Sequence, residues 1–446
     1  MRRRLALVPV VAAVVLGGAL LASRPPDATT GPGSPAAAAS PLTVSPARSP
    51  AAPSPASSAA PSTAPRSPSP SVPLPAPTPP VDTARLDRVL AKARERYAIP
   101  GMSATVIWSD GTAWSGAAGV ADVKSKSRVT PDTVFAAASI SKTFTAALIL
   151  ALVEEGRLSL DDRIHEHVAG LSTVKVPKAV TIRMLLDHTS GIYDFYRHPK
   201  IDKVLLGERD RTWTAAQAMR YVGKPYFKPG TEWRYSNTNY LLLGLVAETV
   251  TGRPLADELR ARFIEPLDLD QTTFQGAEPA AGRTTRSYRF SSVAKAARPI
   301  PLDDGSGIVP FTSVVTASGG AGSIASTSRD LARWARALYG GQVLDEETLA
   351  LMLGSVEGTS LYKPSVPYGF GVQRVKVAGH TAYGHSGRFV GARSLVRYLP
   401  DLGLSVAVVS NTNRTDLSVI LGNLVKAAAP APEVVPGPVP TAVPTA

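Results

Sequence analysis

An abrupt change of composition at Val81 limits which part of this 446-residue chain can fold. Residues 24–80 consist mainly of Pro, Ala, Ser and Thr and hold nearly half of the chain's 40 prolines. Such a segment cannot bury an apolar core, so we expect a disordered linker there and a second disordered tail over residues 429–446. The linker's composition suits a stalk and a plain spacer equally. Residues 81–428 have ordinary globular composition, and we expect one folded domain there, built as two packed subdomains.

The first residues carry the pattern of an export signal. A basic start, Met1–Arg4, precedes an almost uninterrupted apolar run over residues 5–21. This run is at the short end for a spanning helix, which needs about 17–25 residues. Small residues at Gly17–Ala19 suit cleavage, although two leucines follow them. We interpret residues 1–23 as a signal peptide or an N-terminal membrane anchor. The folded domain is expected outside the cytoplasmic membrane, secreted or held at its outer face or in the cell wall.

Charge and cysteine content exclude several classes of function. The formal net charge is +13, and the first 80 residues hold six basic residues against one acidic residue, which leaves +8 spread over the remainder. No dense Lys/Arg stripe with interleaved aromatic residues occurs, so nucleic-acid binding is not expected. The chain has no cysteine, which excludes a thiol nucleophile and a disulfide. The sequence does not predict the oligomeric state.

Hydrophobic periodicity places strands near both ends of the domain and helices between them. Helices are predicted over 84–97, 180–187, 214–222, 238–251, 329–338 and 417–428, and strands over 102–108, 113–120, 368–375, 389–398 and 404–410. This order predicts an α/β (α+β) fold: an antiparallel sheet built from both termini, flanked by helices, with an inserted, mostly helical region.

Ser139 and Lys142 lie where small apolar residues give way to a long apolar helix. Three residues apart, they share one face of that helix, so an amine stands beside a hydroxyl. An adjacent base can activate a serine nucleophile, and burial lowers a lysine's pKa far enough for that role. The helix N-terminus also offers backbone N–H groups to an oxyanion.

The spacing by itself is not specific. Three further S-x-x-K matches occur, none of which opens a long apolar helix: Ser172/Lys175, Ser292/Lys295 and Ser360/Lys363. Taken alone, Ser139 fits a polar helix start above an ordinary lysine as well as a catalytic pair. Two later segments therefore decide the interpretation.

The first of these segments is Tyr235-Ser236-Asn237, the single Y-x-N of the sequence, directly before an apolar helix. A phenol near an ammonium can exchange protons with a nucleophile or a leaving group. The amide of Asn237 can hold a substrate carbonyl. In isolation, Tyr and Asn at a helix start more often serve capping.

The second segment, 384–388, is predicted to lie between two strands. Gly387 would let a substrate backbone approach a strand edge, and His385 and Ser386 would offer donors to an anionic group. A lone histidine of this kind is more often structural. A different group, His165-Glu166-His167 beside Asp161 and Asp162, lacks a helical i, i+4 pair and a convincing third ligand, so no metal is expected.

Together these motifs resemble those of the penicillin-recognising serine hydrolases, the class C β-lactamases and the exported D-alanyl-D-alanine carboxypeptidases. Segments 185–191 (LLDHTSG) and 319–323 (GGAGS) are also typical of that group. The resemblance spans roughly residues 81–428 and implies a β-lactamase/transpeptidase-like fold that needs no cofactor. The roles it implies are a nucleophile at Ser139, its activating partner at Lys142, a general acid/base at Tyr235, substrate-amide binding at Asn237, and an oxyanion hole from the backbone N–H groups of Ser139 and Arg388.

His385 stands where many relatives have lysine. Histidine at this position resembles the carboxypeptidase and aminopeptidase branch. The resemblance therefore implies an exported D-alanyl-D-alanine carboxypeptidase that acts on peptidoglycan stem peptides through an acyl-enzyme on Ser139. The alternatives are a class C-like β-lactamase that takes β-lactams, a carboxylesterase of the same fold, and a non-catalytic envelope module that binds penicillin or wall peptides. Substrate choice is expected to lie in loops such as residues 275–312.

Overall fold

A computed structural model describes residues 82–171, 174–292, 297–354, 356 and 366–429 of the chain. The interpretations of residues 1–23, 24–80 and 430–446 lie outside the described residues. Each of the three competing S-x-x-K pairs also has at least one member outside them.

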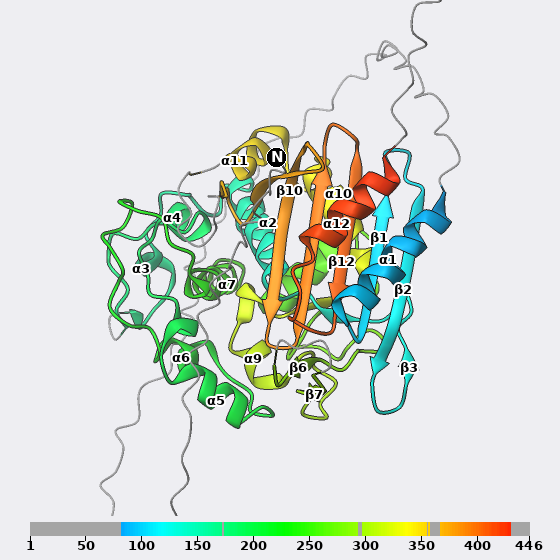
Figure 1. Cartoon of the computed structure of the whole chain (residues 1–446). Helices are drawn as coiled ribbons and strands as arrows, with labels where there is room; N and C mark the ends of the chain where they lie inside the picture. Colours follow the sequence, from blue (N-terminus) through cyan, green and yellow to red (C-terminus); the bar gives the residue numbers. More distant parts are fainter. Residues whose placement is uncertain (1–81, 172–173, 293–296, 355, 357–365, 430–446) are drawn as a thin grey trace, which may run out of the picture. The chain divides into compact units, whose positions relative to one another are not determined.

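One seven-stranded antiparallel sheet forms the centre of the domain, in the order β3-β2-β1-β12-β11-β10-β9 (Figure 1). Its strands are β1 (Gly101–Ile107), β2 (Ala113–Asp122), β3 (Ser127–Arg128), β9 (Gln373–Val377), β10 (His380–Phe389), β11 (Ala392–Leu399) and β12 (Leu404–Ser410). The first strand pairs with the last, with Met102 opposite Ser410. The expected sheet built from both ends of the domain is thus confirmed.

Strand β12 shows why helices cover both faces of this sheet. All seven of its residues are buried, as expected for a central strand with both faces covered. Val406 and Val408 pack into the core beneath α1 (Thr83–Tyr97) and α12 (Ser418–Ala428), which lie side by side on one face (Figure 1). The alternate residues Ala407 and Val409 belong to the larger core on the opposite face, with α10 (Ser328–Tyr339) and α2 (Ser141–Glu154).

Helix α2 is the central element of that larger core. Eleven of its 14 residues are buried, so it is enclosed on nearly every side. It packs on α7 (Asn237–Thr251), the longest helix of the mostly helical region. The other helices are α3 (Ile164–His167), α4 (Ile182–Leu186), α5 (Ile201–Gly207), α6 (Ala215–Met219), α8 (Leu255–Leu259), α9 (Thr312–Thr316) and α11 (Glu346–Leu353), with short turns η1 (Ala138–Ile140), η3 (Phe195–Arg197), η4 (Arg260–Ile264) and η5 (Gly319–Ala321).

Two small sheets complete the described part of the domain. One has the order β4-β8-β5 and the other pairs β6 with β7. Their strands are β4 (Phe135–Ala136), β5 (Thr273–Phe274), β6 (Tyr288–Phe290), β7 (Pro299–Pro301) and β8 (Ile324–Ser326). None of the helices among the described residues is long and apolar enough to cross a membrane.

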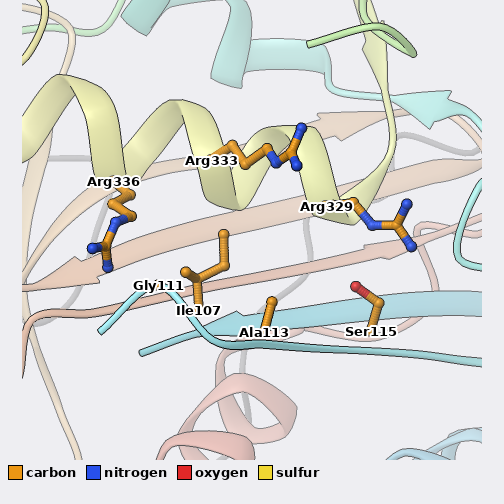
Figure 2. A pocket seen from close by; sticks show the side chains of 7 residues that line it. All are labelled: Ile107, Gly111, Ala113, Ser115, Arg329, Arg333 and Arg336. Carbon is orange, nitrogen blue, oxygen red and sulfur yellow. The ribbon is translucent and has the colours of Figure 1, made fainter. Parts of the chain in front are cut away.

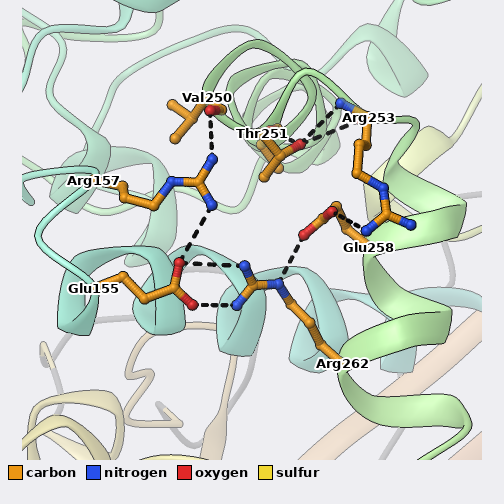
Figure 3. A network of polar contacts seen from close by, with 8 residues as sticks. Glu155, Arg157, Val250, Thr251, Arg253, Glu258 and Arg262 are labelled. Carbon is orange, nitrogen blue, oxygen red and sulfur yellow. Dashed lines mark hydrogen bonds and ion pairs between the residues drawn. The ribbon is translucent and has the colours of Figure 1, made fainter. Parts of the chain in front are cut away.

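An ion-pair network fixes the C-terminal end of α2 to the α7–α8 region (Figure 3). Arg262 contacts Glu258 at 2.7 Å and also pairs with Glu155 at the end of α2. Arg157 donates to the carbonyl oxygen of Val250 at 2.8 Å. The guanidinium of Arg262 thus joins the end of α2 to α8, and Arg157 links the same end of α2 to α7, which carries Asn237.

The C-terminal sheet differs from the sequence prediction in two places. Segment 384–388 was expected between strands, but it lies inside β10. The expected strand over 368–375 begins only at Gln373, and Tyr368 takes part in isolated bridges. Glycines explain both errors, because Gly384 and Gly387 resemble turn residues in sequence, and Gly371 interrupts the second run with a φ of 74°.

Candidate active site

Ser139 lies in a tightly held turn between β4 and α2. The preceding residue, Ala138, has a φ of 48°, in the left-handed region that side chains other than Gly, Asn and Asp rarely adopt. The hydroxyl of Ser141 donates to the Ala138 carbonyl oxygen at 2.7 Å and accepts from the Ile324 N–H at 3.0 Å. The surrounding structure thus imposes a strained conformation directly before a partly exposed serine.

Lys142 is completely buried, and its amine contacts three oxygen atoms. Nζ lies 3.2 Å from Ser139 Oγ, 2.9 Å from Asn237 Oδ1 and 2.7 Å from the Ala321 carbonyl oxygen. Burial lowers the pKa of Lys142 to about 7, and the nearby charge of Asp194 acts in the opposite direction. A neutral amine has two N–H donors and one lone pair. The two carbonyl-type oxygens take both donors, so the lone pair faces the Ser139 hydroxyl and can accept its proton.

Asp194 orients the amide of Asn237 at the start of α7. Asn237 Nδ2 donates to both carboxylate oxygens of Asp194, at 3.3 Å and 3.1 Å. Since the carboxylate accepts, the amide oxygen of Asn237 has to face Lys142. Burial raises the pKa of Asp194, while hydrogen bonds from Asn237 and the Tyr196 N–H favour its ionised form. The contact of Asn237 with a substrate amide, which the resemblance implies, stays a prediction.

Tyr235 also lies close to the Lys142 amine. Lys142 Nζ lies 5.1 Å from the centroid of its half-buried ring. The three residues expected to be catalytic therefore meet at one amine, although Ser139 comes from η1, Lys142 from α2 and Tyr235 from the segment before α7. The role of Tyr235 as general acid/base stays a prediction.

His385 is enclosed in the protein interior rather than presented to a ligand. Its side chain is only 1% exposed, and Nδ1 lies 2.7 Å from the Ser386 carbonyl oxygen. Because a carbonyl only accepts, Nδ1 carries the proton and Nε2 accepts from the Tyr368 hydroxyl at 2.9 Å. Burial lowers the pKa of His385 well below its usual range, and the charge of Lys142 adds to this effect. The imidazole is therefore neutral and, as it lies here, offers no donor to an anionic group.

The edge of β10 faces the turn that carries Ser139. The Ser386 N–H donates to Gln373 Oε1 at 3.2 Å, which shows that this N–H points away from β11. Strand alternation places the N–H of Arg388 on the same edge. The N–H of Ser139 belongs to a first helical turn, where such donors have no intrahelical partner. Both expected oxyanion-hole donors thus lie on neighbouring elements, since β10 packs against η1.

Gly387 is required by packing within the protein. A Cβ atom at this position would overlap the carbonyl oxygen of Ala137 and Oγ of Ser394. Ser394 in turn donates to the Ala137 carbonyl oxygen at 2.6 Å. The strand therefore lies directly against the residues that lead to Ser139, whereas the sequence suggested that the glycine makes room for substrate.

Two residues near the site, Asp194 and His188, had no role in the sequence analysis. Asp194 carried no local signal, because it reaches Asn237 across 43 residues of chain. His188 lies in the LLDHTSG segment, and its ring is 4.3 Å from that of Tyr235.

Two other clusters of polar side chains lie outside the Ser139 site, and the side chains of both form hydrogen bonds or ion pairs within the protein. Ligand atoms of Asp162, Glu166 and His167 lie within 4.8 Å of one another. Asp162 already accepts from the Ser159 N–H at 2.8 Å and Glu166 from the Arg163 N–H at 3.3 Å, so both carboxylates stabilise local turns.

A cavity of about 570 Å³ lies between α10 and the β1–β2 hairpin, lined on one side by three arginines (Figure 2). Arg329 pairs with Asp132 at 3.1 Å, Arg333 donates to the Asp268 carbonyl oxygen at 3.0 Å, and Arg336 donates to the Ser109 carbonyl oxygen at 2.8 Å. None of the lining residues belongs to the Ser139 site.

Comparisons with known proteins find similar proteins that cover most of the chain. Residues 86–429 match the family model described as Beta-lactamase. Penicillin-binding protein 4 of Amycolatopsis lactamdurans is 30% identical over 344 residues, which cover 74% of this chain and 86% of that protein. A D-stereospecific amidohydrolase from Streptomyces sp. superposes with a TM-score of 0.66 at 31% identity, over 78% of this chain and 98% of that structure. The D-amino acid amidase of Ochrobactrum anthropi SV3 shares the fold, with a TM-score of 0.66 at 24% identity over 77% of this chain and 97% of that structure.

Proposed function

Because the chain belongs to the beta-lactamase and penicillin-binding family, whose members are serine hydrolases, we propose that it is an exported D-alanyl-D-alanine carboxypeptidase acting on peptidoglycan stem peptides. The observation that carries the catalytic part is the buried amine of Lys142, with a pKa of about 7, 3.2 Å from Ser139 Oγ. Two relatives support the substrate class. One is named for binding penicillin and the other for hydrolysing D-configured substrates. A D-alanyl-D-alanine end has its scissile amide between two D-residues.

The reaction proceeds through an acyl-enzyme. Lys142 takes the proton of Ser139 while Oγ attacks the carbonyl carbon of the penultimate D-alanine. The N–H groups of Ser139 and Arg388 stabilise the oxyanion of the tetrahedral intermediate. Tyr235 and Lys142 pass the proton to the leaving amine, and terminal D-alanine departs as the ester on Ser139 forms. Water then attacks the ester carbonyl carbon and gives a proton to the same pair. The bond from that carbon to Ser139 Oγ breaks, the pair returns the proton to Oγ, and the shortened peptide leaves with a new carboxyl group.

The test is release of D-alanine from a diacetyl-L-lysyl-D-alanyl-D-alanine peptide by the purified protein. We expect release by the parent protein and none by Ser139→Ala. Absence of D-alanine release from a folded parent protein whose Ser139 reacts with penicillin would contradict the proposed substrate. Rapid turnover of a chromogenic cephalosporin or of small esters would then identify a β-lactamase or a carboxylesterase. Stable penicillin labelling without turnover of any substrate would identify a binding module.

A second candidate, an amidase for D-amino acid amides, is favoured by the state of His385. A peptide with a terminal carboxylate gains from a cation in the site, but His385 is buried and neutral. Ammonia release from D-phenylalanine amide that exceeds D-alanine release from the peptide would select the amidase.

Export is part of the proposal and rests on the sequence of residues 1–80. The basic start, the apolar run over residues 5–21 and the Pro-rich linker support a domain outside the cytoplasmic membrane. Cell fractionation should recover the protein from the medium, the cell wall or the membrane. N-terminal sequencing then distinguishes a cleaved signal from a retained tether. Recovery from the soluble cytoplasm with Met1 intact would contradict export.

A further inference from the structure

His188 holds the backbone on both sides of Tyr235. Its carbonyl oxygen accepts the N–H of Arg234 at 3.1 Å, and its ring Nδ1 accepts the N–H of Ser236 at 3.3 Å. Its ring lies 4.3 Å from the ring of Tyr235. One residue thus contacts the residue before Tyr235, the residue after it, and the ring itself.

We propose that His188 is the positioning residue of Tyr235, a role that rests on the proposed proton transfer by Tyr235. Because His188 is completely buried, it acts on the reaction through Tyr235. The site then needs a histidine in LLDHTSG for geometry rather than for proton transfer.

The backbone conformation of His188 limits which residue types could position Tyr235 from this place in the chain. Its φ of 66° lies in the left-handed region, which Gly, Asn, Asp and His adopt more readily than other residues. This conformation lets the carbonyl oxygen and the ring reach the same neighbouring segment. Among the preferred types, Gly lacks an acceptor beyond its backbone, and only His adds an aromatic surface against Tyr235.

The hydrogen bonds of the ring determine its tautomer. Nδ1 lies within reach of the N–H of Ser236 and, at 3.2 Å, of Asn239 Nδ2, both of which are donors. Nδ1 is therefore an acceptor, and the proton resides on Nε2. Within the part of the chain that the structure describes, Nε2 is buried without a hydrogen-bond partner. A buried donor without a partner lowers stability, which makes this histidine an unfavourable choice for stability alone.

The surroundings of the ring keep it neutral. Four aromatic rings enclose it at centroid distances of 4.3–5.9 Å: Tyr235, Tyr368, Tyr240 and Trp233. Burial lowers the pKa of His188 well below its usual range, and the charge of Lys142 acts in the same direction. The neighbouring residue in the chain, Asp187, carries the carboxyl group next to His188. The imidazole therefore does not compete with Lys142 for a proton.

Two substitutions separate positioning from simple folding. His188→Asn keeps a side-chain acceptor near the position of Nδ1 and tolerates the left-handed backbone. His188→Gly tolerates the same backbone but removes both the acceptor and the ring. His380→Asn, at a partly exposed histidine that pairs with Asp401, is the matched control.

The readout is the rate of acylation by a fluorescent penicillin, together with labelling by a fluorophosphonate, which reports an activated serine whatever the natural substrate. A misplacement near 1 Å costs about 100-fold, so we expect a loss of that size for His188→Gly in kcat and in acylation, with KM little changed. We expect His188→Asn to restore most of the rate and His380→Asn to match the parent. The dependence of the rate on pH should keep its rise near pH 7 in all variants.

Several outcomes would overturn the positioning role. These are His188→Gly acylating within a few-fold of the parent, both substitutions losing equal activity in folded protein, or a pH rise that is lost with His188. Should His188→Gly fail to fold, nitrogen NMR of histidine-labelled parent protein still tests the proposal. It should show His188 still neutral at pH 6.5, the usual pKa of histidine, with the proton on Nε2. A charged ring or the opposite tautomer would contradict the proposal. Fluorophosphonate labelling without D-alanine release would refute only the proposed substrate.

Discussion

The two walls of the site, the start of α2 and the edge of β10, are built by different means. On the α2 side, side chains supply the chemistry: Lys142 faces Ser139, and a chain of contacts through Asn237 ends at Asp194. On the β10 side, the backbone supplies it, because Gly387 allows close packing and the imidazole of His385 is buried and neutral. The comparison teaches that the reactivity of a residue on the helix depends on its side-chain partners. The position of backbone donors on the strand edge depends on how closely the strand packs.

Lys142→Arg should have the largest effect, because it alters the group that takes the proton. Guanidinium stays charged at neutral pH and cannot serve as a base. General acid–base catalysis contributes about 10²–10⁴-fold, so we expect acylation by penicillin to fall by at least that factor in protein that remains folded. Stopped-flow kinetics measure the acylation rate, and a thermal melt shows whether the protein remains folded. Lys92→Arg, on the outer face of α1, is the control and should leave acylation unchanged.

Tyr235→Phe tests whether Tyr235 works together with Lys142 on the side-chain side of the site. We expect a loss similar to that of Lys142→Arg, and a double substitution whose loss is much smaller than the product of the two. Residues that act as one unit give this non-additive pattern. Fully multiplicative losses would show that Tyr235 and Lys142 act independently.

Gly387→Ala tests the β10 wall. The added methyl group overlaps the Ala137 carbonyl oxygen, so the strand has to move away from the turn that carries Ser139. Overpacking costs about 1–3 kcal/mol of unfolding free energy, and a shift of the oxyanion donors near 1 Å costs about 100-fold in acylation. Gly422→Ala is the matched control, because nothing lies within 4 Å of its added carbon. Equal behaviour of the two variants would show that β10 does not need this close contact.

Asp194→Asn should have a smaller effect, with a defined direction in pH. The charge of Asp194 raises the pKa of Lys142, so its removal lowers that pKa further. The rise of acylation with pH should therefore move below pH 7. The maximal rate should fall by about tenfold or more, because the Asn237 amide loses its fixed orientation. A rise that stays in place or moves to higher pH would argue against an effect of the Asp194 charge on the amine.

Tyr368→Phe should have the smallest effect on catalysis. It removes the hydroxyl that donates to His385 Nε2 and leaves a buried acceptor unpaired. Chemical denaturation should show a loss of about 1–3 kcal/mol in unfolding free energy, while acylation stays near that of the parent. A large loss of acylation with unchanged stability would mean that this hydroxyl takes part in the reaction.

The sequence predicted local features well and long-range ones poorly. The spacing of Ser139 and Lys142 fixes their common face because a helix is a local structure. The strands at both ends predicted the central sheet. The place of His385 inside β10 was missed, since Gly384 and Gly387 resemble turn residues. Asp194 and His188 were missed because their partners lie 43 and 48 residues away, and no local pattern encodes such contacts.

The pH dependence of acylation by penicillin tests the central claim, that the Lys142 amine activates Ser139, most directly. The base has to be unprotonated, so the rate should rise with pH through the lowered pKa of Lys142, at about 7. The rise should be absent in Lys142→Arg and should persist in His188→Asn. A rise centred near the ordinary lysine pKa of about 10.4, or one retained in Lys142→Arg, would contradict the assignment of Lys142 as the base.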